Sequence, residues 1–150
     1  MSDAMHTRPP ISPGPTLDAV VRLLASAQLP TEDLTPAHCE SFFFAGPASE
    51  PTGLVGLELF GDVALLRSLV VAPGRRGNGD GSALLKHAED QARSCGVRSI
   101  YLLTTTAEPF FERHGYQRAA RESAPAAIRA TREFAGICPA SSAFMVRQLS

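Results

Sequence analysis

Apolar residues follow two different spacings along the chain, and the spacing in each stretch predicts its secondary structure. Near the N-terminus they recur every three or four residues, which indicates a helix with Thr16 as N-cap and Leu29-Pro30 as its end. Its apolar stripe consists of Leu17, Val20, Val21, Leu24 and Ala27. Residues 1–15 hold four prolines and few apolar anchors, so we expect a flexible segment with at most one short strand before Pro13.

Shorter apolar segments bounded by glycine and proline predict strands. Gly61-Asp62 separates two of them and indicates a hairpin with a short glycine turn. The predicted strands cover 41–45, 53–60, 63–71, 99–104, 117–120 and 142–149.

Helical spacing returns between these strands, over 82–95, 108–114 and 124–134. In the helix over 82–95, Gly96 stands where a C-terminal cap belongs. Its predicted inner stripe is Leu84, Ala88, Ala92 and Cys95, and its predicted water-facing residues are Lys86, Glu89, Asp90 and Arg93.

This order of elements predicts an α/β fold with a mixed sheet and helices on both faces. The 150 residues suit a single domain over 16–150. A net charge of −1 argues against nucleic acid as a partner. No apolar run is long enough to span a membrane, and the N-terminus lacks the apolar middle of a secretion signal, so a cytoplasmic protein is expected.

The three cysteines and four histidines lack metal-ligand spacing, so no metal is expected. Soft thiolates would suit trivalent arsenic. The spacing does not bring Cys39, Cys95 and Cys138 together, and a thiol site for arsenic is therefore not expected.

A glycine-rich loop stands between a predicted strand and a predicted helix, with Gly77, Gly79 and Gly81 in five residues. Backbone amides without side chains before a helix N-terminus can bind phosphate. The alternative interpretation of this loop is a purely structural turn. The spacing G-x-G-x-G fits neither the dinucleotide fingerprint nor the nucleoside triphosphate loop, which needs a lysine.

Two motifs resemble the GCN5-related N-acetyltransferase (GNAT) superfamily. The first is Q/R-x-x-G-x-G/A, matched by Arg76, Gly79 and Gly81. The second is N-x-x-A-x-x-F-Y-x-K-x-G-F, which reads here as Thr104, Ala107, Phe110, Phe111, Arg113, Gly115 and Tyr116. The resemblance covers about residues 53–149. It implies a mostly antiparallel sheet in which the strand before the loop splays from its neighbour.

The resemblance also implies acetyl-CoA as co-substrate. The loop amides of Arg76, Gly77, Asn78, Gly79, Asp80, Gly81 and Ser82 would hold its pyrophosphate. The backbone of Leu69, Val70 and Val71 would pair with the pantetheine arm, and the N–H near Val70 would stabilise the oxyanion. From the second motif, Thr104, Phe110, Phe111 and Arg113 would contact the cofactor.

Three of these positions depart from the family pattern. The tyrosine that commonly protonates the departing thiolate is Phe111, which has no proton to donate. Thr104 replaces the asparagine that contacts pantetheine, and its hydroxyl can still form a hydrogen bond. Arg113 replaces lysine and keeps the positive charge that could meet a CoA phosphate.

The runs ALLRSLVVAP, YLLTTTAEPFFERHGY and PAAIRATREFAGICPASSAFM look like the arsenic-resistance N-acetyltransferase subgroup, which is similar to phosphinothricin acetyltransferases. This narrower resemblance implies an amino-acid-like substrate that carries an anionic group, including arsenic-containing or phosphinothricin-like compounds.

The site chemistry needs a base for the amine and a partner for that anion. Glu58, the one acid in GLVGLELF, is the candidate base, or else it faces solvent. Arg67 lies mid-strand among apolar residues, where its fork would bind a substrate oxyanion or else pair with Glu58 and hold the hairpin. Ser68, Thr105, Thr106 and Arg129 complete the candidate substrate site.

We therefore expect an acetyl-CoA-dependent N-acetyltransferase acting on a small amine, as a homodimer by family analogy. Acetylation of a protein N-terminus or a lysine is one alternative. A non-catalytic acyl-CoA sensor is the other, and Phe111 makes it plausible.

Overall fold

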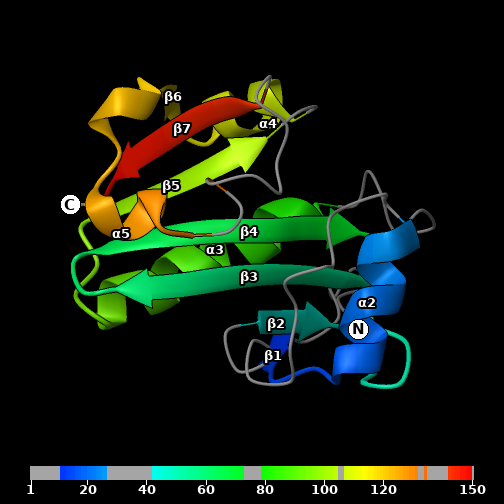
Figure 1. The fold of residues 1–150 in the computed structure, drawn as a ribbon. Coiled ribbons are helices and arrows are strands. Elements are labelled where there is room, and N and C mark those ends of the chain that lie inside the picture. The colour runs from blue at the N-terminus through cyan, green and yellow to red at the C-terminus, as the bar shows by residue number, and fades with distance from the viewer. Residues whose placement is uncertain are drawn as a thin grey trace, which may run out of the picture. The chain divides into compact units, whose positions relative to one another are not determined.

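The computed structural model describes residues 11–26, 42–72, 79–104, 107–131, 134 and 142–149. Its strands form one seven-stranded sheet of order β1-β2-β3-β4-β5-β7-β6 (Figure 1). Its strands are β1 (Ile11–Pro13), β2 (Phe42–Ala45), β3 (Gly53–Phe60), β4 (Val63–Val71), β5 (Ser99–Thr104), β6 (Gln117–Arg118) and β7 (Ala143–Gln148). The helices are α2 (Leu17–Ser26), α3 (Asp80–Ser94), α4 (Glu108–Arg113), a 3-10 turn η3 (Arg121–Ser123) and α5 (Ala126–Arg129). Only β4 and β5 pair in parallel among the pairs with a defined register, which confirms the predicted mixed sheet.

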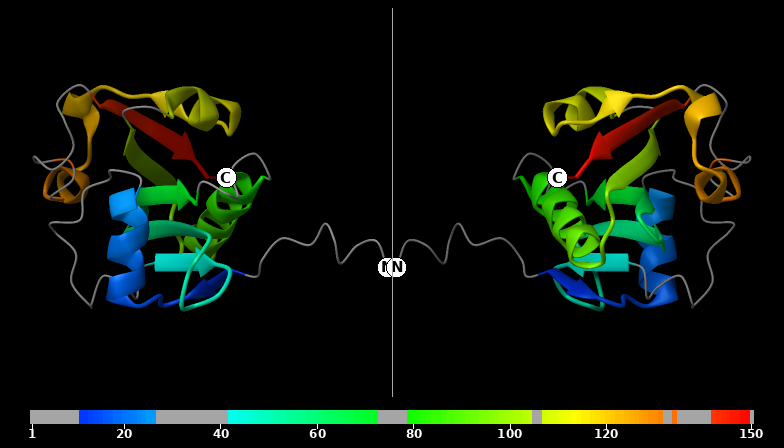
Figure 2. Two further views of the ribbon diagram at one scale, coloured as in Figure 1. Left: turned by 90° about the vertical axis from the view of Figure 1, so that its right-hand side faces the viewer. Right: turned by 90° about the vertical axis from the view of Figure 1, so that its left-hand side faces the viewer.

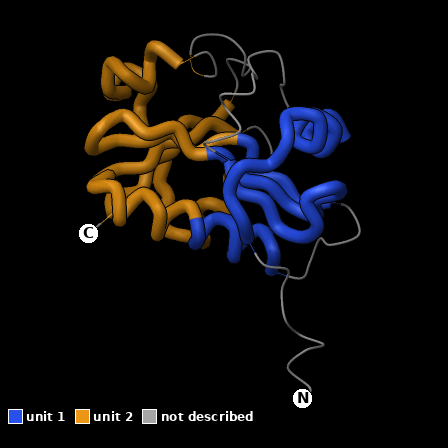
Figure 3. The backbone as a smooth tube through the Cα atoms, turned by 90° about the horizontal axis from the view of Figure 1, so that it is seen from below, with its two compact units in different colours: residues 1–56, 68–87 blue, residues 57–67, 88–150 orange. Residues whose placement is uncertain are grey.

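The chain divides into two compact units (Figure 3). The first comprises residues 1–56 and 68–87, and the second residues 57–67 and 88–150. The elements β3, β4 and α3 contribute residues to both.

In the first unit, the strand β2 reads Phe-Phe-Phe-Ala and sends alternate rings to opposite faces. Phe42 and Phe44 join the core formed with α2, which lies along one side of these strands in Figure 2. That core contains Val20, Leu23, Leu24, Leu54 and Val70 as well. Phe43 meets the ring of His87 in α3 edge-on, with centroids 4.7 Å apart. A helix therefore packs on each face of this part of the sheet.

In the second unit, a cluster of apolar side chains covers one face of the strands. Its buried members are Leu65, Ala124, Ile128 and Phe144. Half-buried members surround them, namely Phe60, Val63, Tyr101, Leu103, Ala119 and Phe134. Phe144 stacks on Tyr101 at 5.4 Å and meets Phe134 edge-on at 5.3 Å.

The predicted turns and caps that rest on glycine are confirmed. Gly61 has φ +72° in the turn between β3 and β4. Gly96 has φ +85°, and its N–H donates to the carbonyl of Arg93 at 3.1 Å just after α3 ends. Both positions need a left-handed backbone, which glycine adopts without a steric penalty.

The predicted helix over 124–134 is wrong in extent. The structure has η3 before it and an α-helix of only four residues, Ala126–Arg129. Ala124 is extended, with ψ 135°, because Pro125 follows it and disfavours a helical conformation in the preceding residue. The strand expected over 117–120 likewise ends at Arg118.

The faces of α3 also differ from the prediction at two residues. Cys95, expected in the inner stripe, is exposed beyond the end of the helix. Glu89, expected in water, is 5% exposed, because Tyr116 and Arg147 supply the polar partners that a buried carboxylate requires. The remaining stripe of Leu84, Ala88 and Ala92 is buried as predicted.

Candidate active site

Glu58 and Arg67 form an ion pair in the second unit. Nη1 of Arg67 lies 3.1 Å from Oε2 of Glu58, with side chains 1% and 19% exposed respectively. Phe60 and Val63 flank the two-residue turn of the hairpin, so positions 58 and 67 fall on the same face of β3 and β4. The pairing that the sequence offered as one reading of Arg67 is therefore present.

Ser68, next to Arg67, interrupts the regular conformation of β4. Its φ is +61°, and it is the one non-glycine residue in the described part of the chain with a positive φ. The parallel register between β4 and β5 covers only Val63–Leu65 and Ser99–Tyr101. A left-handed residue inside a strand is strained, and such strain gathers at functional sites. This local departure fits the splayed strand that the family resemblance implies.

The residues after Ser68 are the ones whose backbone the family resemblance assigned to the cofactor. Val70 is 7% exposed, and its side chain packs in the core of the first unit, so only its backbone could serve a ligand. Leu69 and Val71 are half-buried. These placements agree with a role for main-chain groups at this strand.

The glycine loop leads into the N-terminus of α3. Gly79 has φ +80°, and its carbonyl accepts from the N–H of Ala83 at 3.1 Å, which makes Asp80, Gly81 and Ser82 the first turn of the helix. Asp80 is 3% exposed, and its negative charge favours the helix terminus. Arg76, Gly77 and Asn78 lie outside the described residues.

An acyl-CoA pyrophosphate would suit this terminus. The helix α3 is 15 residues long, and the first-turn amides of an α-helix can bind an anion. Gly79 and Gly81 add no side chain in front of them. The buried carboxylate of Asp80 is the one opposing charge that the described part of this loop presents.

The second motif surrounds the short helix α4. Oγ1 of Thr104 accepts the N–H of Ala107 at 3.1 Å, so this hydroxyl helps to start the helix. Phe111 is 5% exposed, with its ring edge-on to Phe110 at 5.2 Å. The guanidinium of the exposed Arg113 lies 5.9 Å from the ring of Phe110. Thr105 and Thr106 lie outside the described residues.

Tyr116 belongs to a buried polar group that sequence reasoning missed. Its hydroxyl donates to Oε2 of Glu89 at 3.0 Å, and Nη1 of Arg147 reaches the same oxygen at 2.9 Å. Burial, followed by the neighbouring Glu89 charge, raises the pKa of Tyr116 far above its usual range. The Tyr116 hydroxyl therefore stays protonated and bound to Glu89. The only signal in the sequence was a tyrosine in place of the motif's last phenylalanine.

The tail of the second unit holds Arg129, the other predicted oxyanion partner. Its guanidinium donates to the backbone carbonyls of Glu122 and, at 3.1 Å, of Ala124. In this structure Arg129 therefore stabilises the turn before α5.

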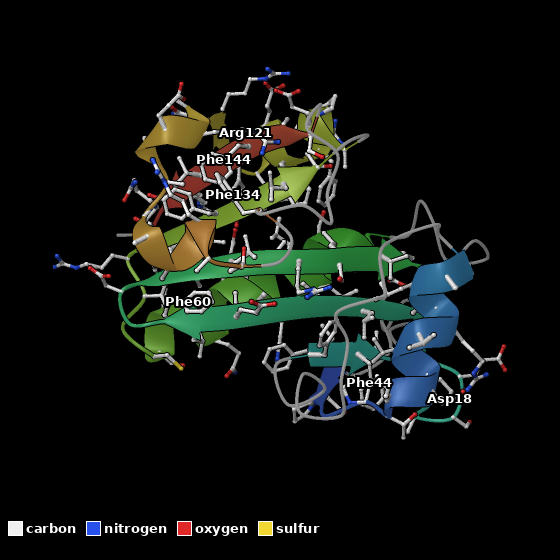
Figure 4. All side chains as sticks on the ribbon, in the orientation of Figure 1. Asp18, Phe44, Phe60, Arg121, Phe134 and Phe144 are labelled. Carbon is white, nitrogen blue, oxygen red and sulfur yellow. The ribbon has the colours of Figure 1, made fainter. Side chains whose placement is uncertain are left out.

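The aromatic residues Phe60, Phe134 and Phe144 are labelled in Figure 4 together with Arg121, whose guanidinium lies 5.6 Å from the ring of Phe134.

Within the ranges that the structure describes, no group of three or more histidine, cysteine, aspartate or glutamate side chains could hold a metal ion. No described helix has both the length and the apolar character to cross a membrane. Cys39 and Cys138 lie outside the described residues, whereas Cys95 is a free thiol.

The strained Ser68 and the glycine-led N-terminus of α3, which can bind an anion, agree with the two motifs that resemble the GNAT superfamily. The model of the Acetyltransferase (GNAT) family matches residues 14–116. This match covers well over half of the 150 residues, so the chain belongs to the GNAT acetyltransferase family. The fold predicted from the two motifs is thereby confirmed.

Two amino-acid acetyltransferases are similar over part of the chain. The protein from Ralstonia nicotianae is 40% identical over 63 residues, which are 42% of this chain and 14% of that protein. The protein from Azotobacter vinelandii is 36% identical over 66 residues, or 44% of this chain and 15% of that protein. The chain thus spans only a small part of the length of these curated relatives.

Solved structures share the fold along most of the chain. N-acetylglutamate synthase from Neisseria gonorrhoeae, complexed with coenzyme A and N-acetyl-glutamate, superimposes with a TM-score of 0.78 at 23% identity, over 94% of this chain and 35% of that one. Rv2747 from Mycobacterium tuberculosis, in complex with CoA and NLQ, gives 0.76 at 18% identity, over 95% and 100% of the two chains.

Proposed function

We propose that this protein transfers the acetyl group of acetyl-CoA to the amine of a small, anionic, amino-acid-like substrate. The observation that carries this proposal is the buried Arg67, paired with Glu58 beside the strained Ser68. A paired cation and carboxylate suit a substrate that contains both an amine and an anion, and Arg67 directly precedes in sequence the segment assigned to the thioester. The amino-acid acetyltransferases among the relatives support the same substrate class.

Acetyl-CoA would be held mainly by backbone groups. The first turn of α3 after Gly79 would bind the pyrophosphate, and the strand residues Leu69–Val71 would pair with the pantetheine arm. Bound there, the co-substrate supplies the activated acetyl group. The N–H near Val70 would donate a hydrogen bond to the carbonyl oxygen as negative charge develops on it.

Glu58 would take a proton from the substrate ammonium, because only the neutral amine can attack a carbonyl carbon. Arg67 would hold the substrate anion. Phe111 is buried and carries no donor, so this chain places no tyrosine hydroxyl at that position for the departing sulfur. Catalysis would then depend chiefly on the placement of the amine and on its deprotonation.

The experiment that tests this proposal measures free-thiol release from acetyl-CoA with a panel of amino acids, and calorimetry measures acetyl-CoA binding in parallel. Turnover that yields an N-acetylated amino acid supports the proposal. Binding without turnover of any amine would instead identify an acyl-CoA sensor. Acetylation confined to peptides would identify a protein acetyltransferase.

The proposal also includes a subgroup of the family, an oligomeric state and a place in the cell. The runs ALLRSLVVAP, YLLTTTAEPFFERHGY and the tail over 125–145 resemble the arsenic-resistance and phosphinothricin-type subgroup, so arsenical and phosphinic amino acids belong in the panel. A homodimer follows from family analogy, and light scattering would test it. We place the reaction in the cytoplasm, and localisation of a tagged protein in cell fractions would check this.

A further inference from the structure

We propose that Ser142 recognises the side chain of the acetylated amino acid, through a hydrogen bond between its hydroxyl and a polar group at the end of that side chain. This inference rests on the proposed acetylation of an amino acid. It deepens that function by naming the substrate class, which is an amino acid whose side chain ends in an uncharged hydrogen-bonding group, above all an amide.

The hydroxyl of Ser142 is buried without a hydrogen-bond partner. Ser142 is 6% exposed, and within the ranges that the structure describes its Oγ is the one buried side-chain nitrogen or oxygen that lacks such a partner. A buried polar group that stays unpaired destabilises the folded state, and an alanine would avoid this loss. A ligand or a water molecule that completes its bonding therefore explains a hydroxyl at this position.

Ser99 shows the ordinary arrangement of a buried serine in the same pair of strands. It is 9% exposed, and its Oγ donates to Oε1 of Gln148 at 2.7 Å. Ser99 and Gln148 face each other at one end of the β5 and β7 pairing, whereas Ser142 adjoins the other end. The two serines thus differ in hydrogen bonding and are alike in burial.

Ser142 lies at the border of the apolar cluster on the sheet face that carries Glu58 and Arg67. Arg67 stands two residues after Leu65 in β4, so these two side chains point to the same face. Leu65 belongs to that cluster, as does Phe144 of β7, two residues after Ser142.

Arg121 links Ser142 to the same cluster. Its Nη2 donates to the backbone carbonyl of Ser142 at 2.9 Å. Its guanidinium lies 5.6 Å from the ring of Phe134, which meets Phe144 edge-on at 5.3 Å (Figure 4). Ser142 is therefore beside the face on which Glu58 would meet the substrate amine.

Ser142 also lies at the carboxyl end of β5. Thr104, the last residue of β5, pairs with Ala143, which follows Ser142. Ligands of open α/β sheets bind outside the carboxyl ends of the strands. This position suits contact with the part of the substrate that extends away from the amine.

The hydroxyl is enclosed in the free protein, so a substrate group reaches it by displacing a neighbouring side chain. Arg121 is such a neighbour, because it is half-buried and its described bond goes to the carbonyl of Ser142. Its long side chain reaches the surface, so it can move aside while the core of the unit stays closed.

The chemistry of the hydroxyl selects the side chain. A serine hydroxyl offers one donor and two acceptor lone pairs, and an amide offers a carbonyl acceptor and two N–H donors. The two groups can therefore satisfy each other. An apolar side chain of the same shape would leave the hydroxyl unpaired and would bind less tightly.

Matched substrates provide the first test. Asparagine and leucine have side chains of the same shape, as have glutamine and homoleucine, and the members of each pair differ in the polar tip. In the wild type we expect kcat/KM to be higher for the amide by roughly 2- to 10-fold in at least one pair, the usual effect of one neutral hydrogen bond. In Ser142→Ala this preference should vanish, because kcat/KM falls for the amide. Ser142→Cys, whose thiol is a weak donor, should behave in the same way.

Stability provides the second test, which does not depend on turnover. Ser142→Ala should keep or raise the Tm of the free protein, because it removes a polar group that has no partner. Ser99→Ala is the matched control and should lower the Tm, since it breaks the bond to Gln148. Thermal unfolding without ligand measures both variants against the wild type.

The outcomes separate the inference from the proposed function. A lower Tm of free Ser142→Ala would overturn the inference, because the hydroxyl would then be bonded to an ordered water or within the protein. An amide preference that is absent from the wild type, or unchanged in Ser142→Ala, would also overturn it while amine acetylation stands. Failure to acetylate any amine, in a protein that binds acetyl-CoA, would overturn both.

Discussion

The hydroxyl of Tyr116 donates a hydrogen bond to Oε2 of Glu89 at 3.0 Å, and both residues are buried in the second unit. The same carboxylate oxygen lies 2.9 Å from Nη1 of Arg147, so one acid on α3 is shared by a residue after α4 and a residue of β7. Neither partner is close to Glu89 in the sequence. The arrangement stabilises the fold around the second motif and leaves the Tyr116 hydroxyl engaged with Glu89.

Tyr116→Phe should lower the free energy of unfolding by about 1–3 kcal/mol, since a buried carboxylate loses one donor. The pH dependence should change as well. The raised pKa means that the folded state keeps the phenolic proton where the unfolded chain, with a pKa near 10.0, releases it. The contribution of Tyr116 to the free energy of unfolding is therefore complete below pH 10. Above pH 10 it is lost, and the free energy of unfolding falls by about 1.4 kcal/mol per pH unit.

Chemical denaturation from pH 7 to 11 checks this prediction. The part of the fall in the free energy of unfolding at alkaline pH that depends on Tyr116 should be absent from the variant Tyr116→Phe. Tyr101→Phe is the matched control, because it removes the hydroxyl of a half-buried tyrosine in β5. Equal alkaline slopes in the wild type and Tyr116→Phe would contradict the role given to burial.

Gly79→Val should abolish acetyl-CoA binding. Its φ of +80° disfavours a β-branched residue, and the new side chain would stand before the first turn of α3. Isothermal titration calorimetry measures the effect. Gly14→Val is the control, because Gly14 has φ +71° in the same unit and a Cβ there would meet nothing within 4 Å. A normal Kd in Gly79→Val would refute the phosphate cradle.

Ser68→Gly should keep acetyl-CoA affinity within a few-fold, because glycine accepts the left-handed backbone of φ +61°. Ser68→Val should weaken binding and lower the Tm, since a strained backbone of this kind costs about 1–3 kcal/mol even before a β-branched residue is forced into it. Leu59→Val places the same residue at an exposed position of β3 and should change neither property. Equal tolerance of Val at 68 and 59 would mean that the strain has no function.

The triple variant Cys39→Ser, Cys95→Ser, Cys138→Ser should keep its turnover with amines that contain no arsenic. Cys95 is exposed and lies beyond the end of α3, away from the residues assigned to catalysis in sequence. The thiol-release assay can be followed directly, alongside a melting curve. Complete loss of turnover in a folded variant would restore a catalytic or metalloid-binding thiol.

The sequence predicted the mixed sheet because the strand signals are local. The turn at Gly61, the cap at Gly96 and the alternation along β2 each depend on neighbouring residues. The predicted helix over 124–134 began too early, because Ala124 is extended before Pro125 and α5 starts only at Ala126.

Polar pairing was harder to predict than the fold. The sequence offered the Glu58 and Arg67 pair as one of two readings, since both lie on one hairpin. It placed Glu89 in water, because its partners come from distant elements that only the folded chain brings together. The left-handed Ser68 carried no local signal, as serine has no preference for that conformation inside a strand.

The burial of Phe111 has a consequence for the sulfur end of the reaction. A ring 5% exposed, edge-on to Tyr116 at 5.6 Å, supplies no proton to a departing thiolate. The rate should then follow the acidity of the leaving thiol steeply. Thioesters of more acidic thiols should react faster, and an oxygen-ester analogue of acetyl-CoA should be inert.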